Sequence, residues 1–315
     1  MTSVDRGANA YVVLAGGLGN QLFQISALLG LDSRYQKLWL NGVSKPRLST
    51  DGLPESLTLL DLPNRMVPMI FQGLLQKIVN LNLKYSVPDV EGIERKITTK
   101  IVKIISEVIF SLVLVEKIKI VNLVDEIPNV QKKTGNIMLI GYFQTSIYAE
   151  NIKNQVSLNR SQILHGRVEA LDLQRESTIT SPLVIHIRRS DYQLDSNFGL
   201  LSGQYYLSAL KGKSVDFQPI WVFSDDIEHA RILLSEITSR VTKWISDVDD
   251  SSTMSLIAMS LGKSFIIANS TFSWWGAYLS DASPNVYYPE SWLKGIPHRE
   301  DLFPKNWVPF VAEYE

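Results

Sequence analysis

Short apolar runs alternate with amphipathic stretches along the C-terminal part of the chain. The predicted strands are 183–187, 220–223, 241–245 and 264–268. Helices are expected near 205–211, 227–237, 253–261 and 273–279. Such alternation is typical of a parallel sheet wrapped by helices. Ligands of these sheets bind beyond the carboxyl ends of the strands, so the loops that follow the strands are where we look for chemistry.

The N-terminal part begins with a predicted strand, 11–15, a glycine-rich turn and a helix from about Gln21. A length of 315 residues fits two domains of ordinary size. The polar stretch 157–181 is the expected boundary. We therefore predict an α/β protein with an N-terminal lobe over 1–175 and a C-terminal lobe over 180–315.

Composition excludes several classes of function. The 31 basic and 32 acidic residues give a net charge of -1, so no overall field attracts nucleic acid. The chain has no cysteine, and its four histidines are scattered, so disulfides and a histidine metal site are not expected. The early apolar run YVVLA is too short for a secretion signal, and the later run 104–115 is too short to cross a bilayer. We expect a cytoplasmic protein.

A glycine-rich loop, AGGLGNQLFQ, occupies 15–24. Glycine allows backbone N–H groups to approach an anion, and a helix N-terminus favours negative charge. The loop is neither a dinucleotide fingerprint nor a P-loop, because Leu22 stands where the third glycine belongs and no GK[ST] follows. A purely structural turn explains these glycines equally well.

The segment HIRRSDYQLD, 186–195, follows an apolar strand. A guanidinium fork matches phosphate oxygens, so two arginines here predict a phosphate clamp. Alternation along the strand favours Arg188 over Arg189. The competing interpretation is a surface ion pair between Arg188 and Asp191. His186 taken alone is more typical of a core or turn residue.

Two further loops follow predicted strands. In FSDD, 223–226, one aspartate can cap the next helix while the other accepts hydrogen bonds from a guanine base. In ANSTFSWWGAYLS, 268–280, hydroxyls and a helix N-terminus can hold a pyrophosphate, although hydroxyls also cap helices. Trp274 and Trp275 are predicted to pack in the core.

Two other segments have open interpretations. DVDD, 247–250, contains an Asp-any-Asp triplet, Asp247 and Asp249, of the kind that holds a metal in one class of glycosyltransferases, but helix capping is favoured. The basic, helical stretch 55–125 could bind an acceptor or a membrane surface, and ordinary helix packing is favoured.

Several separated segments carry a resemblance. GGLGNQLFQ (16–24), HIRRSDY (186–192) and NSTFSWWGAYL (269–279), with GYFQ (141–144) and FSDD, look like the signature segments of the bacterial alpha-1,2-fucosyltransferases of glycosyltransferase family 11. They occur in the right order and span most of the chain. The resemblance implies a GT-B-like architecture, with two Rossmann-like lobes facing across a cleft.

The resemblance also implies roles for individual residues. Arg188 looks like the ligand of the donor's β-phosphate, and Asp191 and Asp195 are candidate bases. The remaining donor contacts implied are Gly17, Gly19, Asn20, His186, Asp225, Ser270, Thr271 and Phe272. The sequence departs from the family pattern at Ser190 and in LLSGQYY (200–206). Both places lie beside the predicted phosphate clamp, and they bear on the identity of the acceptor more than on that of the donor.

The implied reaction is inverting transfer of L-fucose from GDP-beta-L-fucose to the 2-hydroxyl of a terminal galactose, without a metal or other cofactor. The acceptor would be a galactose-terminated glycan or a lipid-linked oligosaccharide of a surface polysaccharide such as an O-antigen. Peripheral attachment to the inner membrane is a hypothesis. The alternatives are a metal-dependent glycosyltransferase using Asp247 and Asp249, or a GDP-sugar-binding protein without turnover.

Overall fold

The computed structural model describes residues 8–86, 93–131, 135–194, 198–211, 218–281, 284–294 and 298–315. The chain divides into two compact units, Met1–Asn154 and Gln155–Glu315. Helix α6 (Val168–Thr180) packs on helix α9 (Ser252–Met259) of the second unit. The division between the units therefore lies earlier in the chain than the polar stretch suggested.

The first unit is built on a five-stranded sheet in which all described pairs are parallel. Its order is β3-β2-β1-β5-β4. The strands are β1 (Asn9–Val12), β2 (Gln36–Asn41), β3 (Asn64–Met66), β4 (Ile118–Val121) and β5 (Asn136–Leu139). The sequence changes direction across the sheet between β1 and β5, and this is the switch point of the unit.

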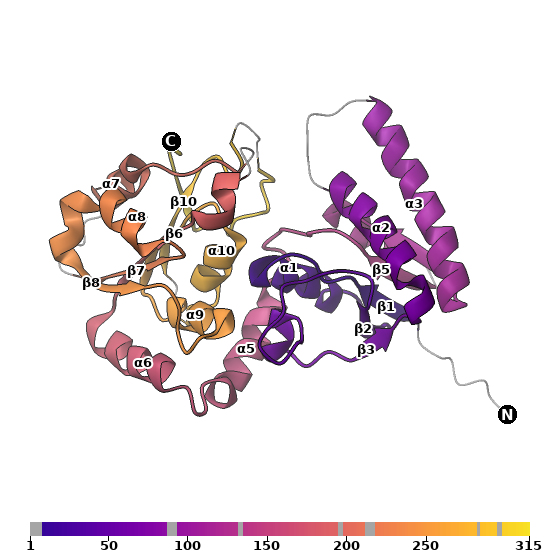
Figure 1. Ribbon diagram of the computed structural model, residues 1–315, viewed down its shortest axis with the longest axis horizontal. Coiled ribbons are helices and arrows are strands. Elements are labelled where there is room, and N and C mark those ends of the chain that lie inside the picture. Colours follow the sequence, from indigo (N-terminus) through magenta and orange to yellow (C-terminus); the bar gives the residue numbers. More distant parts are fainter. Residues whose placement is uncertain are drawn as a thin grey trace. The chain divides into compact units, whose positions relative to one another are not determined.

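Helices cover the sheet of the first unit. They are α1 (Leu18–Leu29), α2 (Met69–Ser86), α3 (Ile93–Leu114) and α4 (Ile127–Gln131), with 3-10 helices η1 (Glu55–Thr58) and η2 (Val124–Glu126). The inward faces of α2 and α3 join the strands in one apolar core that includes Leu75, Val79, Phe110, Leu40 and Met138. In Figure 1, α2 and α3 run alongside one another, and the two helices are in contact.

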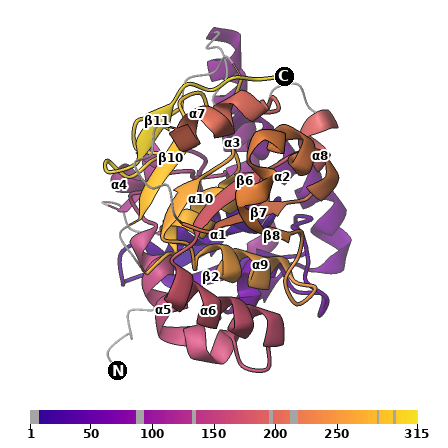
Figure 2. The ribbon, with the colours of Figure 1, turned by 90° about the vertical axis from the view of Figure 1, so that its left-hand side faces the viewer.

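The second unit contains a six-stranded parallel sheet in the order β11-β10-β9-β6-β7-β8. The strands are β6 (Leu183–Ile187), β7 (Ile220–Ser224), β8 (Val241–Ile245), β9 (Ser264–Ile266), β10 (Asn285–Pro289) and β11 (Val308–Phe310). Figure 2 shows β6, β7 and β8 side by side, and β9 lies between β6 and β10 in the sheet. Read from β8, this is the doubly wound 3-2-1-4-5-6 order, whose switch point lies between β6 and β9.

Helices cover both faces of the second sheet. The remaining ones are α5 (Glu150–Ile163), which spans the division between units, α7 (Gly203–Lys211), α8 (Ile227–Leu233) and α10 (Thr271–Tyr278), with η3 (Ser190–Leu194) and η4 (Ser235–Arg240). Figure 1 shows α7 and α8 on one side of the strands and α6 and α9 on the other. The prediction of an α/β protein with two Rossmann-like units is confirmed by the two parallel sheets.

Local details differ from the sequence predictions. Helix α1 begins at Leu18, because Gly17 has an extended backbone (φ -79°, ψ 174°) and serves as its N-cap. Helix α8 ends at Leu233, and a 3-10 helix continues to Arg240. The strands β10 and β11 were not predicted. Within the described ranges, no helix is both long and apolar enough to cross a membrane.

Candidate functional site

The loops after β6 and β9 meet at the switch point of the second sheet. The Tyr192 hydroxyl donates a hydrogen bond to the Asn269 carbonyl oxygen (3.0 Å), which links the two loops directly. The ring centroids of His186, on β6, and Phe272, on α10, are 5.8 Å apart. The structure thus brings the HIRRSDY and NSTFSWW segments together at the position where open α/β sheets bind ligands.

Arg188 lies at the carboxyl end of β6 and is held by its neighbours. Its Nη1 is 3.1 Å from Oδ2 of Asp225, and its guanidinium carbon lies 5.7 Å from the centre of the Tyr192 ring. The side chain is 18% exposed, so the cation is held in place and still reaches the surface. A guanidinium fixed in this way is preorganised to donate hydrogen bonds to phosphate oxygens.

Asp225 holds the segment 188–190 that follows β6, which we call the clamp loop. Its two carboxylate oxygens accept hydrogen bonds from the backbone N–H groups of Arg189 (2.9 Å) and Ser190 (3.2 Å) in addition to the Arg188 contact. The next residue, Asp226, caps α8 by accepting from the His229 N–H (3.0 Å). Of the two aspartates, the second is therefore the helix cap, and a nucleoside contact by Asp225 stays a prediction.

Arg189 has a different partner. It is 5% exposed, and its guanidinium makes paired hydrogen bonds of 2.7 and 3.0 Å to the Glu315 carboxylate. A buried arginine needs such a partner because its charge cannot be neutralised by losing a proton. Its guanidinium therefore anchors the loop to the C-terminal segment.

His186 is buried beneath the clamp. Burial, and secondarily the positive charge of Arg188, lower its pKa to about 3, while the Asp225 carboxylate acts weakly in the opposite direction. The imidazole is therefore neutral at physiological pH. Its Nδ1 has no hydrogen-bond partner among the described residues. A buried neutral imidazole with an unpaired nitrogen can still form a hydrogen bond with a ligand.

The fourth loop presents the N-terminus of α10. Ser270 is the N-cap residue and is buried, but its side chain makes no capping hydrogen bond. Ser273 Oγ instead donates to carbonyl oxygens at the start of the helix. The first N–H groups of a helix have no partner within the helix, so those at Thr271 and Phe272 suit an anion. Trp274 is fully buried, as is Trp275, which confirms their predicted core packing.

The glycine loop of the first unit differs from the loops of the second unit because its helix N-terminus already has a carboxylate partner. Gly16 adopts the left-handed region (φ +77°), whereas Gly17 is the N-cap of α1, and Gly19 and Asn20 lie within that helix. The Leu18 N–H donates to the carboxylate of buried Glu55 (3.1 Å). The chain therefore supplies its own negative charge to this helix N-terminus.

Two buried glutamines that sequence reasoning missed hold this loop. Gln24 accepts from the Ala15 N–H (2.9 Å) and donates to the Gly141 carbonyl (3.0 Å), so it bridges the loops after β1 and β5. Gln21 donates to the Gly16 carbonyl (3.0 Å). Two amides three residues apart on an otherwise apolar helix were the available signal, since buried polar groups need partners.

The two candidate bases, Asp191 and Asp195, follow the clamp arginines in the sequence. Asp191 lies in η3, and its side chain is not among those described. Asp195 lies outside the described residues. Gly17, Gly19 and Asn20 belong to the first unit, whereas His186, Arg188, Asp225, Ser270, Thr271 and Phe272 belong to the second. The latter set surrounds one switch point.

The Asp-any-Asp triplet has structural partners. Asp247 accepts hydrogen bonds from the Val248 N–H and the Ser255 hydroxyl, both at 2.8 Å. Asp249 accepts from the N–H groups of Glu169 (3.3 Å) and Ala170 (3.1 Å) and so caps α6. Across the described parts of the chain, no three His, Asp or Glu side chains are grouped as a metal site.

Comparison with characterised proteins gives two relatives from Escherichia coli. An alpha-1,2-colitosyltransferase is 30% identical over 186 residues, which cover 55% of this chain and 62% of that protein. The match thus spans less than two thirds of the colitosyltransferase. The O-antigen biosynthesis glycosyltransferase WbnK is 25% identical over 322 aligned positions, covering 95% of this chain and 99% of WbnK.

Solved structures with a similar fold include two transferases. The ADP-heptose LPS heptosyltransferase II of Escherichia coli gives a TM-score of 0.48 at 10% identity and covers 96% of this chain and 90% of its own. The fucosyltransferase NodZ from Bradyrhizobium gives 0.41 at 11% identity, with coverages of 86% and 92%. Residues 95–310 match the family model described as Glycosyl transferase family 11. The chain belongs to glycosyltransferase family 11.

Proposed function

We propose that the chain is an inverting glycosyltransferase that moves L-fucose from GDP-beta-L-fucose to the 2-hydroxyl of a terminal galactose. The observation that carries the proposal is that Arg188 and the N-terminus of α10 both follow strands at the same switch point, between β6 and β9. A diphosphate leaving group needs cationic and N–H donors at that place, since negative charge develops on it as the sugar departs.

The proposed reaction is a single displacement at the anomeric carbon. The acceptor 2-hydroxyl forms the new bond while the bond from the anomeric carbon to the diphosphate oxygen breaks, so that the configuration inverts and GDP leaves. Arg188 stabilises the β-phosphate, and the amides of Thr271 and Phe272 bind the same diphosphate. The acceptor's proton passes to a carboxylate, for which Asp191 and Asp195 are the candidates.

Neutral His186 fits a role in binding the nucleoside better than proton transfer. With a pKa of about 3, it is too weak a base to hold a proton at neutral pH. It can instead accept or donate one hydrogen bond without adding charge. Asp225 is proposed to contact the nucleoside and to keep Arg188 in position, consistent with its hydrogen bonds to the clamp loop.

A second donor is favoured by one comparison. The relative that is 30% identical is an alpha-1,2-colitosyltransferase, and colitose is the 3-deoxy counterpart of fucose. The two donors differ in one hydroxyl, so a site that hydrogen-bonds the fucose 3-hydroxyl would discriminate strongly against colitose. The linkage is proposed to be the same for either sugar, with a glycan of the O-antigen type as acceptor.

The test is release of GDP from GDP-fucose and from GDP-colitose, with lactose and a panel of galactose-terminated glycans as acceptors. Turnover with EDTA present, and an alpha-1,2 linkage in the product by NMR, is the expected result. Loss of turnover in EDTA that a divalent metal restores would contradict the metal-free mechanism. Donor binding without turnover on any acceptor would favour a GDP-sugar-binding protein instead.

A further inference from the structure

The outward faces of α2 and α3 are apolar. On α2, Ile70, Leu74 and Leu81 are exposed at spacings of four and seven residues, which places them on one side of the helix. The exposed apolar side chains of α3 also follow helical spacing, and they are Ile97, Ile101, Ile104, Ile105, Val108 and Leu112. We call these nine residues the outer face. Single exposed apolar residues are ordinary, but a continuous set marks an interaction surface.

The opposite faces of both helices are already packed. Leu75 and Val79 of α2, and Phe110 and Leu114 of α3, are buried in the core of the first unit. Each helix therefore has two apolar sides, one buried in the core and one exposed in the outer face. Packing within the described part of the first unit does not account for it.

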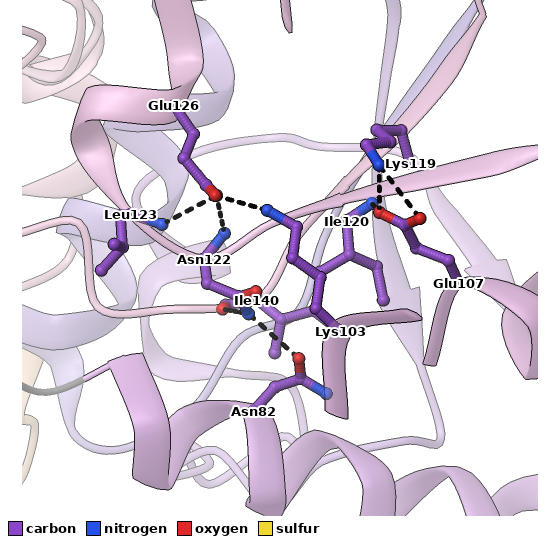
Figure 3. A network of polar contacts seen from close by, with 9 residues as sticks. All are labelled: Asn82, Lys103, Glu107, Lys119, Ile120, Asn122, Leu123, Glu126 and Ile140. Carbon is purple, nitrogen blue, oxygen red and sulfur yellow. Dashed lines mark hydrogen bonds and ion pairs between the residues drawn. The ribbon is translucent and has the colours of Figure 1, made fainter. Parts of the chain in front are cut away.

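Polar contacts also fix α2 and α3 to the sheet (Figure 3). Asn122, which follows β4, donates to Asn82 Oδ1 on α2 (3.1 Å) and to the Ile140 carbonyl (2.8 Å). On α3, Lys103 pairs with Glu126 near the same loop. Glu107 of α3 accepts from the Ile120 N–H (3.1 Å) and pairs with Lys119.

These contacts hold the helices in one rotational setting, because buried polar groups are costly to leave without partners. The outer face is consequently a fixed feature of the unit. Rotating either helix to bury it would break the hydrogen bonds that Figure 3 shows.

Lysines are interleaved with the outer face. On α2, Lys77 and Lys84 continue the helical spacing of Ile70, Leu74 and Leu81. These lysines and apolar side chains therefore lie on the same side of the helix. Lys100 adjoins Ile101 on α3, and each of these three lysines is exposed. Helix α2 contains no acidic residue. A second copy of this face would oppose lysine to lysine, whereas an anionic lipid surface complements both the charge and the apolar side chains.

We propose that the outer face docks on an anionic phospholipid surface. The apolar side chains of both helices enter the boundary between headgroups and acyl chains, and Lys77, Lys84 and Lys100 contact lipid phosphates. The described helices include none apolar enough to span a bilayer, so α2 and α3 lie along the surface. This goes beyond the proposed reaction and does not depend on which sugar is transferred.

The test is co-sedimentation of the full chain with vesicles of phosphatidylcholine alone and of phosphatidylcholine with phosphatidylglycerol. We expect binding to the anionic vesicles that weakens as salt is raised, since the lysine contribution is screened. The double variant Ile101→Glu with Ile104→Glu should lose this binding. A matched control is Ile232→Glu, which changes an exposed isoleucine of the second unit and should bind as the wild type does.

A second pair of variants tests the charge. Lys77→Glu with Lys100→Glu should lower the vesicle partition coefficient by at least an order of magnitude, because each lysine contributes roughly fivefold. Circular dichroism of every variant checks folding, and all five substituted side chains are exposed.

Several results would overturn the proposal. Wild-type protein that stays in solution with anionic vesicles would do so, as would outer-face variants that bind like the wild type. A wild-type dimer in analytical ultracentrifugation that Ile101→Glu with Ile104→Glu converts to a monomer, with no vesicle binding, would assign the face to a second copy of the chain.

Discussion

The switch points of the two sheets differ in what fills them. In the first unit, the Gln24 side chain bridges the loops after β1 and β5, and the Glu55 carboxylate accepts from the first amide of α1. In the second unit, the corresponding loops present Arg188, the unpaired Nδ1 of His186 and the N-terminus of α10. In the first unit a carboxylate of the chain accepts from the helix N-terminus, whereas in the second the Asp225 carboxylate pairs with Arg188 and the N-cap side chain of α10 makes no capping hydrogen bond.

A strand, a loop and a helix with favourable residues therefore do not by themselves identify an anion site. Both units have that arrangement, and both loops carry family motifs. The distinguishing feature is whether a carboxylate of the chain accepts from the N-terminus of the helix that follows the loop. At α1 that carboxylate belongs to Glu55, which is 37 residues away from Leu18 in the chain. From this contrast we propose that the nucleotide binds to the second unit, and the following predictions test the two sides of the comparison.

The largest effect is expected for Arg188→Ala. Removing the cation from the second switch point should lower kcat/KM by about 100- to 1,000-fold, or about 3 kcal/mol, as for loss of one donor to a developing oxyanion. The measurement is GDP release at low donor concentration. Arg175→Ala is the control, because Arg175 is 76% exposed and pairs only at the surface with Asp172, and this variant should retain full activity.

The second prediction concerns the filled crevice of the first unit. Gln24→Leu leaves the Ala15 N–H and the Gly141 carbonyl without their partner, so the free energy of unfolding should fall by about 2–3 kcal/mol. Urea denaturation measures this change. Gln204→Leu, on the exposed face of α7, should change stability by less than about 0.5 kcal/mol. Equal effects of the two variants would show that Gln24 is not a buried bridge.

The third prediction follows from the pKa of His186. It is about 3 in the folded protein and 6.5 in the unfolded chain, so only the unfolded chain takes up a proton between those values. Stability should consequently fall as pH is lowered from about 6.5 towards 3, by up to about 1.4 kcal/mol per pH unit from this group.

The corresponding variant is His186→Gln, which does not titrate. Between pH 6 and pH 5, urea denaturation should show wild-type stability falling by about 1 kcal/mol more than that of the variant. Identical slopes for the two proteins would mean that the imidazole can be protonated without cost, and hence that it is not buried as described.

The smallest effect is expected for Asp249→Ala. This carboxylate caps α6, so its loss should reduce the free energy of unfolding by about 1 kcal/mol and leave turnover unchanged. Parallel measurements of thermal stability and GDP release check this. Turnover that collapses in Asp249→Ala while stability is kept would favour the metal-dependent alternative.

Much of the second unit could be predicted from its sequence. Strands such as β6 and β7 are short, continuous apolar runs, which buried parallel strands require. Arg188 and the α10 N-terminus were predicted because they directly follow such strands. Strands β10 and β11 were missed because their sequences, NVYYP and VPF, contain proline and little continuous apolar character.

The polar contacts could not be predicted, for a physical reason. Gln24 and Gly141 are 117 residues apart, and Arg189 and Glu315 are 126 apart, so no local pattern indicates their pairing. Such distant partners determine that Arg189 is buried while Arg188 reaches the surface. Alternation along β6 predicts that Arg188 and Arg189 lie on different sides, which agrees with their different partners, but it could not identify Asp225 or Glu315 as those partners.

Hydrogen–deuterium exchange with and without GDP tests the assignment of the nucleotide most directly. GDP lacks the transferred sugar, so the contacts predicted between that sugar and Gly17, Gly19 or Asn20 would not contribute to the result. The account predicts slower exchange in peptides covering 186–194 and 268–278, with exchange in 15–24 unchanged. Protection confined to 15–24, with none at the second switch point, would contradict it.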